Sequence, residues 1–471
     1  MIKSIKIICF LIAVVLFIEF IDYFIAVLDY PNNIFIDEGI LSRISLSIMA
    51  NGLRFTTLDV YPHILTMYGF LYELVSLPFF YLMEPTVNCG RYVSFASSLI
   101  IIVLLYKMLK KMNISSYLAF ILSMIFLLYK PTAAYGCYSK SDAFATLLTL
   151  VVLYSLYFHR GNKQFIVTLI FSSLALTTKQ TTAFIVPVVL VSFIIQKTDK
   201  KEFFRALKWM FSFILIFAAL FLAIQNYFYN TVTLTLYLGT LYTSMEHLLT
   251  GQVSPLIRAT IFFMIIPVYA IIKNKIKIKE LLSPSVLYLL FYIPIFLMTS
   301  YSTASEVVYF MFIFPPLAVF LGEMIIKYNL KERLFVHLCI LIQLVILLLY
   351  PSKVDALKFT YIKPTSQMKN EAAEIESIIK NAGVERSFVT FSWSSFGLSK
   401  ESAGNLLDFK LGYLIESGKL NPKPYLDDFD KKRFSVIVGG LDLPQLHEGL
   451  LKNYYLYKVI GNTPVYLPKK E

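Results

Sequence analysis

Long apolar runs, separated by short basic clusters, fill the chain as far as about residue 350. Runs of about 20 apolar residues are typical of helices that cross a membrane. The pattern predicts eleven spans, at residues 7–28, 92–106, 117–129, 143–158, 165–176, 182–195, 209–225, 257–272, 281–298, 308–326 and 334–350. Because some of these runs are short, we expect their helices to extend into the flanking polar residues. The predicted fold class is a polytopic α-helical membrane protein.

A further apolar stretch, residues 64–83, decides the orientation of everything after it. If it does not cross, every short basic cluster falls on the same side of the membrane as Lys3 and Lys6. These clusters contain Lys107, Lys110, Lys111, Arg160, Lys163, Lys197, Lys200, Lys201, Arg205, Lys273, Lys275, Lys277, Lys279, Lys327, Lys331 and Arg333. Basic loops stay in the cytoplasm. We therefore predict a membrane-embedded or interfacial helix at 64–83, a cytoplasmic N-terminus and an extracytoplasmic C-terminal region.

The first outer loop, residues 29–90, begins with the acidic pair Asp37 and Glu38. An amphipathic helix follows the pair and ends at Asn51 and Gly52. Its apolar face consists of Ile40, Leu41, Ile44, Ile48 and Met49, and Ser42, Arg43, Ser45 and Ser47 lie largely opposite. A helix of this length with a thin apolar stripe is typical of the membrane surface. The pair then lies at the water-facing rim, unless Asp37 only caps the helix.

After Pro351 the charged residues become frequent and the apolar runs shorten, which indicates a soluble domain over residues 351–471. The patterns predict helices at 366–382, 402–409 and 443–452, and strands at 388–391, 434–438 and 454–460. This alternation indicates a small α/β domain. It has no Gly-rich phosphate loop and no metal cluster, so the sequence assigns it no chemistry.

Composition supports this division and narrows the function. Of 471 residues, 57% are hydrophobic and 15% charged, and the mean hydropathy is +0.68, which excludes an ordinary soluble globule. A net charge of +13 would suggest nucleic-acid binding in a soluble protein, but here the basic residues lie between apolar runs and set the topology. The four cysteines have no metal-ligand spacing and indicate neither a zinc site nor a disulfide framework.

The predicted topology brings ionisable side chains to the outer face. They are Asp37, Glu38, Asp59, His63, Arg91, Lys140, Asp142, Lys179, Glu246, His247, Arg258 and Glu306, with Tyr309 beside them. Any one of them could be an interfacial anchor, but Lys179 interrupts an otherwise apolar segment. Carboxylates beside cations suit group transfer from an anionic lipid, because a carboxylate can take a hydroxyl proton while cations stabilise a departing phosphate. The span centres carry almost no charge, which disfavours a transporter.

Six short motifs occur in a fixed order that resembles the GT-C glycosyltransferases. They are residues 36–39 (IDEG), the helix 63–80, residues 90–94 (GRYVS), 141–144 (SDAF), 177–181 (TTKQT) and 314–317 (FPPL). The ordered set, which covers about residues 7–350, is similar to the branch that contains protein O-mannosyltransferases and lipid A aminoarabinose transferases. The C-terminal domain resembles the small extracytoplasmic domain that some members append. The resemblance implies a GT-C-like transmembrane catalytic domain over residues 1–350.

The family resemblance implies roles for particular residues. Asp37 matches the first-loop acidic residue expected to act as base or to orient the acceptor, Glu38 is its partner, and Asp142 matches the second-loop acidic residue. The donor phosphate is expected to contact Lys179, Arg91, His63, Arg258 and Tyr309. One departure is that relatives often begin the second loop helix with a basic Lys-Pro-Pro sequence, whereas this chain has Tyr61-Pro62-His63.

The resemblance also implies the reaction and its partners. A sugar would pass from a polyprenyl-phosphate donor to an extracytoplasmic lipid, glycan or protein hydroxyl, with inversion, in the cytoplasmic membrane of a bacterium. No cofactor is indicated, and a divalent metal stays open. The alternatives are a flippase or transporter for lipid-linked sugars, a transferase similar to O-antigen ligases, and a scaffold without chemistry.

Overall fold

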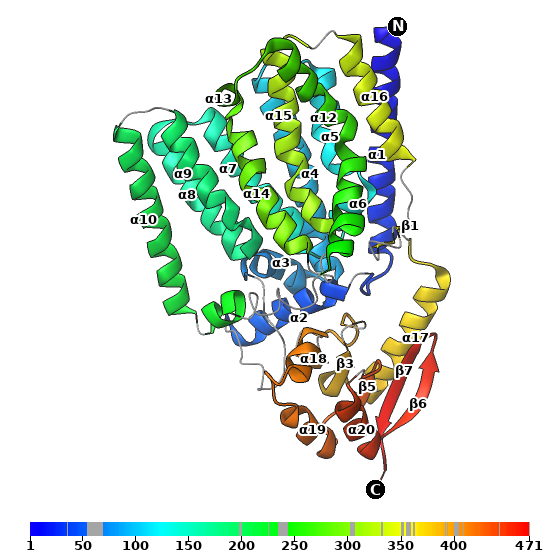
Figure 1. The fold of residues 1–471 in the computed structure, drawn as a ribbon. Helices are drawn as coiled ribbons and strands as arrows, with labels where there is room; N and C mark the ends of the chain where they lie inside the picture. The colour runs from blue at the N-terminus through cyan, green and yellow to red at the C-terminus, as the bar shows by residue number, and fades with distance from the viewer. Residues whose placement is uncertain are drawn as a thin grey trace.

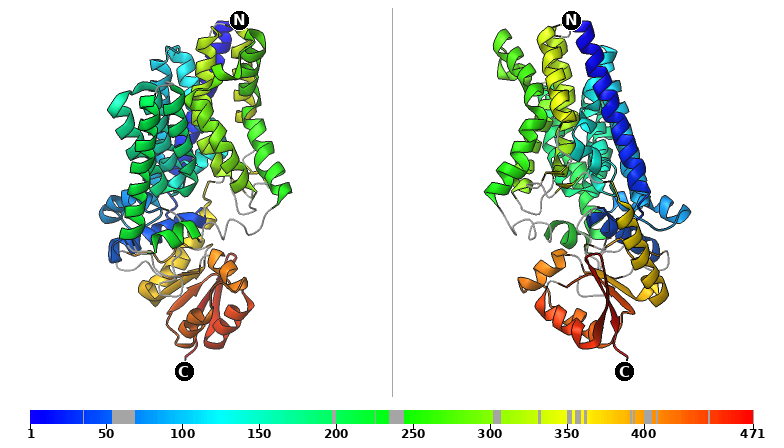
Figure 2. Two further views of the ribbon diagram at one scale, coloured as in Figure 1. Left: turned by 60° about the vertical axis from the view of Figure 1, so that its left-hand side comes forward. Right: turned by 90° about the vertical axis from the view of Figure 1, so that its right-hand side faces the viewer.

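A helical bundle with a small α/β domain at one end makes up the chain in a computed structural model (Figure 1). The structure describes residues 1–34, 36–53, 69–196, 200–224, 226–233, 244–301, 307–330, 333–349, 353–354, 359–360, 363–390, 392, 394–399, 405–407, 409–441 and 443–470. The N-terminus lies at the end of the bundle far from the α/β domain, and the C-terminus lies in that domain (Figure 2). The two termini are therefore at opposite ends of the molecule.

Each predicted span coincides with a helix of the bundle. The helices are α1 (Ile2–Leu28), α4 (Asn88–Lys111), α5 (Ser116–Leu128), α7 (Ser141–Phe158), α8 (Gly161–Thr178), α9 (Ile185–Gln196), α10 (Lys200–Ala223), α12 (Ser254–Asn274), α14 (Pro284–Ser300), α15 (Phe314–Lys327) and α16 (Leu334–Leu348). Short helical segments precede three of them, namely η1 (Gln180–Phe184), η3 (His247–Val253) and η4 (Val307–Phe312). Among the described residues, six helices are long and apolar enough to cross a membrane. The predicted polytopic helical membrane protein is confirmed.

The outward faces of the bundle are apolar. Ile18 on α1 is 58% exposed, and Phe211 and Leu222 on α10 are 62% and 89% exposed. Exposed large apolar side chains would be unfavourable in water, but they are compatible with a lipid surround. Lipid therefore completes the solvation of these helices.

Two helices of the first loop, α2 (Ile36–Asn51) and α3 (Leu71–Leu82), lie across the end of the bundle next to the α/β domain (Figure 1). The bounds of α2 agree with the sequence prediction, and α3 lies at the rim as expected, although residues 54–68 lie outside the described ranges. The expected surface position of α2 needs correction, because Ser42, Arg43 and Ser45 are buried. Their polar face packs inside the protein and is not in water.

The C-terminal domain has a five-stranded sheet with strand order β4-β3-β5-β7-β6. Its strands are β3 (Ser387–Thr390), β4 (Asn405–Leu407), β5 (Val436–Val438), β6 (Tyr454–Ile460) and β7 (Thr463–Pro468). Strand β3 runs parallel to both of its neighbours, β4 and β5, whereas β7 is antiparallel to β5 and β6. A separate pair, β1 (Lys353–Val354) and β2 (Phe359–Thr360), precedes this sheet.

Helices cover both faces of this sheet. On one face, α17 (Ser366–Ala382) packs through Ile375 and Ile379 against Val389. The other face is covered by α18 (Phe409–Glu416), α19 (Lys423–Asp430) and α20 (Pro444–Asn453), with Leu446 packed in the same cluster as Ile437. The domain is thus a three-layer α/β unit.

The helix predicted at 402–409 is wrong. Asn405–Leu407 form strand β4, whose register pairs Val389 with Leu406. Pairing with a strand that is distant in the sequence overrides the local preference of this short segment. The proposed domain boundary between 350 and 351 falls outside the described residues and stays a prediction.

Candidate active site

Asp37 and Glu38, neighbours in the sequence, point to different surroundings. Successive residues on a helix diverge by about 100°, so the two carboxylates of α2 cannot share one direction. Glu38 is fully buried, whereas Asp37 is 8% exposed. The acidic pair is therefore divided into two separate contacts.

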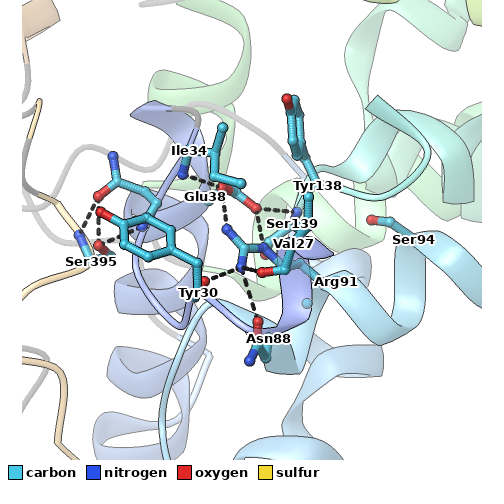
Figure 3. Close-up of polar contacts among 12 residues, drawn as sticks. Val27, Tyr30, Ile34, Glu38, Asn88, Arg91, Ser94, Tyr138, Ser139 and Ser395 are labelled. Carbon is cyan, nitrogen blue, oxygen red and sulfur yellow. Dashed lines mark hydrogen bonds and ion pairs between the residues drawn. The ribbon is translucent and has the colours of Figure 1, made fainter. Parts of the chain in front are cut away.

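Glu38 binds Arg91 of α4 in a buried bidentate ion pair (Figure 3). The Nε and Nη2 atoms of Arg91 donate to Oε1 and Oε2 of Glu38 at 2.7 and 2.8 Å. The backbone nitrogens of Ile34 and Ser139 also donate to these oxygens, at 2.8 and 2.9 Å. Both carboxylate oxygens of Glu38 are thus saturated with hydrogen bonds.

The remaining donors of Arg91 bind the segment between α1 and α2. Its Nη1 donates to the carbonyls of Val27 and Tyr30 at 2.7 and 2.5 Å and to Oδ1 of Asn88 at 3.0 Å. Its Nη2 donates to the carbonyl of Asn32 at 2.8 Å. With every N–H engaged, Arg91 has no donor left for a lipid phosphate. This geometry gives Arg91 and Glu38 a structural role and does not support the phosphate-binding and catalytic roles expected for them.

Asp37 pairs with Lys140, which precedes α7. The Nζ of Lys140 lies 3.1 Å from Oδ2 of Asp37 and 5.1 Å from the ring centroid of Tyr135. Both side chains of the ion pair are nearly buried, at 5% and 11% exposed. The sequence placed Lys140 on the outer face but gave it no role. Its partner is a residue about 100 positions earlier, which sequence spacing does not reveal.

A second ion pair joins Asp142 of α7 to Lys179 at the end of α8. The Nζ of Lys179 also lies 5.0 Å from the ring centroid of Tyr309 on η4, close enough for a cation–π interaction. Asp142 lies in the first turn of α7, where the helix dipole favours an anion. Its Oδ2 has no hydrogen-bond partner among the residues that the structure describes.

The two pairs are connected through one short segment, because Lys140 and Asp142 flank Ser141. Residues two positions apart in an extended chain are separated by at most about 7 Å. The two pairs supply two carboxylates and two ammonium groups, each ammonium group beside an aromatic ring, and all four groups are largely shielded from solvent. A carboxylate can accept a proton there, and an ammonium group can bind a phosphate oxygen.

Arg258, His63, Asp59 and Glu306 are further candidates from the sequence. Arg258 is exposed on α12. His63 and Asp59 lie outside the described residues, as does Glu306. Within the described ranges, no group of three or more His, Cys, Asp or Glu side chains could hold a metal ion.

The sequence analysis missed Glu73 of α3. This side chain is 1% exposed, and neither carboxylate oxygen has a hydrogen-bond partner among the described residues. Burial raises its pKa to about 8. The sequence signal was present, since Glu73 is the one charged residue in the apolar stretch 64–83.

The start of α3 lies against the end of α8, just before Lys179. A Cβ atom on Gly69 would lie 1.8 Å from the carbonyl oxygen of Thr177, so only glycine allows this contact. The ring of Phe70 packs at 5.4 Å on Tyr227. The helix that carries Glu73 is therefore anchored next to the segment that carries Lys179.

The bundle, the two loop helices and the C-terminal α/β domain together form a GT-C-like fold, as the resemblance implied. The chain is similar to ArnT from Cupriavidus metallidurans in the apo state, with a TM-score of 0.56, 12% identity, and 98% of this chain and 97% of that chain covered. It is similar to the same protein bound to undecaprenyl phosphate, with a TM-score of 0.57, 11% identity and the same coverage of 98% and 97%.

ArnT is a GT-C lipid A aminoarabinose transferase. No protein-family model and no curated protein sequence matches the chain. At this sequence identity the similarity establishes the fold.

Replacing Arg91 with Gln should strongly destabilise the protein, because Glu38 would stay buried without its counter-charge. Loss of one partner of a buried pair costs about 3–5 kcal/mol. Thermal unfolding in detergent should show a large fall for Arg91→Gln and a smaller fall for the double variant Glu38→Gln/Arg91→Gln. The exposed Arg333 supplies the control Arg333→Gln. Equal losses in the single and double variants would contradict the coupling.

Replacing Glu73 with Gln should stabilise the protein in a pH-dependent way. Burial raises the pKa of Glu73 from 4.5 to about 8, so its proton is lost more readily in the unfolded state. The carboxyl group therefore costs nothing below pH 4.5, and its cost grows until about pH 8. Melting temperatures of Glu73→Gln and wild type should coincide at low pH and diverge above it. The control is Glu416→Gln at an exposed position; an offset independent of pH would contradict the assignment.

Proposed function

We propose that the chain is an integral-membrane glycosyltransferase that moves a sugar from a polyprenyl-phosphate donor to a hydroxyl group at the membrane surface. The observation that carries the proposal is the adjacency of the Asp37–Lys140 and Asp142–Lys179 pairs at one end of the bundle. It offers a proton acceptor and phosphate-binding cations side by side. The GT-C-like fold, shared with a protein whose structure contains undecaprenyl phosphate, supports the choice of donor class.

The proposed reaction is a single displacement. Asp37 takes the proton of the acceptor hydroxyl, and the oxygen of that hydroxyl forms a bond to the anomeric carbon of the sugar. The bond between the anomeric carbon and the phosphate oxygen breaks, and its electron pair stays on the phosphate. Attack opposite the leaving group inverts the anomeric centre.

The leaving phosphate would bind Lys179, with Lys140 as a second cation close by. Both ammonium groups are nearly buried, which strengthens their attraction to developing negative charge. Asp142 holds Lys179 in place and keeps one oxygen available for a donor hydroxyl. His63 and Arg258 keep the phosphate-binding role that the resemblance implies, and the ring of Tyr309 would hold Lys179 through the cation–π contact.

The proposed topology has a cytoplasmic N-terminus and an extracytoplasmic C-terminal domain in the cytoplasmic membrane of a bacterium. This orientation rests on the positive-inside rule, which places every short basic cluster with Lys3 and Lys6. The termini at opposite ends of the molecule are compatible with it. The site would then face the extracytoplasmic rim, where a lipid donor is confined to two dimensions.

The function can be tested with purified protein in lipid vesicles, radiolabelled polyprenyl-phosphate sugars and a crude envelope extract as acceptor source. Transfer predicts a new labelled product that requires the protein. Label that crosses the bilayer without a new product would support a transporter and overturn the proposal.

In this assay Asp37→Asn should lower kcat by about 10²–10⁴-fold, because the amide cannot take the acceptor proton. Asn retains the shape of Asp but not the charge that faces Lys140, so the melting temperature should fall, and kcat is compared at a temperature at which both proteins are folded. The exposed Asp430 supplies the matched control Asp430→Asn. Turnover of Asp37→Asn near the wild-type rate would remove Asp37 from the mechanism.

Lys179→Gln should weaken donor binding. Loss of a charge-assisted contact of about 1.5–3 kcal/mol corresponds to a rise of about 10- to 100-fold in the donor KM, with little change in the acceptor KM. Gln keeps a hydrogen-bond donor for Asp142, which protects the fold. Lys452→Gln, at a side chain that is 70% exposed, is the control. An unchanged donor KM would make Lys179 an anchor only.

A further inference from the structure

One face of α2 lies directly against the C-terminal domain. Gly39 and Arg43 share this face because they are one turn apart. A Cβ atom on Gly39 would lie 2.3 Å from backbone atoms of both Ser394 and Ser395, so the helix and the 392–399 segment touch through their backbones. Glycine is required here by close approach.

Arg43 inserts a buried charge into the same segment. Its side chain is fully buried, its Nε donates to the carbonyl of Ser394 at 2.8 Å, and its Nη2 donates to the carbonyl of Phe396. Glu376 of α17 lies near the guanidinium group and accepts a hydrogen bond from the backbone of Gly397 at 3.2 Å. A buried arginine that binds main-chain carbonyls fixes the backbone it contacts.

Further contacts extend this interface on either side of Arg43. Ahead of α2, the backbone nitrogen of Asn33 donates to Oγ of Ser395 at 2.7 Å. Along the helix, Ile40 and Leu46 belong to one apolar cluster with Ile375 and Phe396. The C-terminal domain therefore contacts α2 and the segment before it at several positions.

The segment that contacts α2 lies at a position in the sheet where α/β proteins commonly bind ligands. It follows the carboxyl end of β3, the strand that runs parallel to both of its neighbours. In α/β sheets, ligands bind outside the carboxyl ends of such strands, where successive connections diverge. In this chain a helix of the bundle domain, α2, occupies that place through Arg43.

We propose that the C-terminal domain positions Asp37. The domain holds α2 through Arg43 and Gly39 and thereby keeps the carboxylate of Asp37 against Lys140. This inference rests on the proposed function. Glu38–Arg91 fixes the start of α2 to the bundle, and Arg43 fixes its middle to the domain. A rotation of α2 by about 10° would move a side-chain tip about 5 Å from the helix axis by about 1 Å. Displacements of that size can lower rates about 100-fold.

The test uses the full chain in detergent or vesicles, with Gly39→Ala, Arg43→Met and Arg43→Lys. The control is Gly440→Ala, since a Cβ at Gly440 meets nothing within 4 Å. In Gly39→Ala and Arg43→Met, kcat should fall at least about tenfold while the donor KM stays within about twofold, because Lys179 lies on the bundle. Arg43→Lys should fall in between, since lysine retains the charge but not the planar fork.

Two readouts do not need activity. Hydrogen exchange of residues 36–51 and carbodiimide labelling of Asp37 should both rise in Gly39→Ala and Arg43→Met, with the transmembrane helices and Gly440→Ala unchanged. If the wild-type protein shows no sugar transfer, the proposed function is wrong. Hydrogen exchange and carbodiimide labelling would still decide whether the domain positions α2. Wild-type exchange and labelling in both variants would overturn the inference, as would a donor KM that rises while kcat stays constant. If Arg43→Met fails to fold, Gly39→Ala against Gly440→Ala decides the matter.

Discussion

The architecture around the site depends on the buried ion pair between Glu38 and Arg91. It joins the end of α1, the segment before α2, α2 itself, α4 and the segment before α7 through one network of hydrogen bonds. Two buried charges satisfy each other and five backbone groups, so neither is left exposed to an apolar surround. Asp37 and Lys140 both project from segments that this network holds. The Glu38–Arg91 pair therefore fixes the positions of the two residues that form the Asp37–Lys140 pair.

The site combines rigid support with incomplete pairing. Glu38 has every oxygen engaged, whereas Asp142 has one oxygen without a partner among the described residues. Asp37 pairs with Lys140 and Lys179 pairs with Asp142, oppositely charged groups that substrate could replace. Such a distribution suits the transferase that we propose, since in such an enzyme the supporting groups must resist exchange while the reacting groups must accept new partners. The C-terminal domain adds support from the opposite face of α2.

The sequence predicted what depends on local pattern. The spans, α2, α17 and β6 follow from periodicity and composition. The bounds of α17 and β6 match the prediction, whereas several membrane helices extend beyond the predicted apolar runs, as α4 and α10 do. The division between Asp37 and Glu38 was beyond reach, because the deciding partner, Arg91, is 53 positions away from Glu38. Lys140 was named without a role for the same reason. Strand β4 was mistaken for a helix since its pairing with β3 is a tertiary contact.

The contacts of α2 also constrain its length. Glu38 faces the bundle and Arg43 faces the C-terminal domain, and their angular relation is set by the number of residues between them. One inserted or deleted residue in this interval would turn one contact by about 100° relative to the other. A substitution removes one interaction. A change of length would make the contact of Glu38 with the bundle incompatible with the contact of Arg43 with the C-terminal domain. The number of residues from 38 to 43 therefore fixes the orientation of the C-terminal domain relative to the bundle.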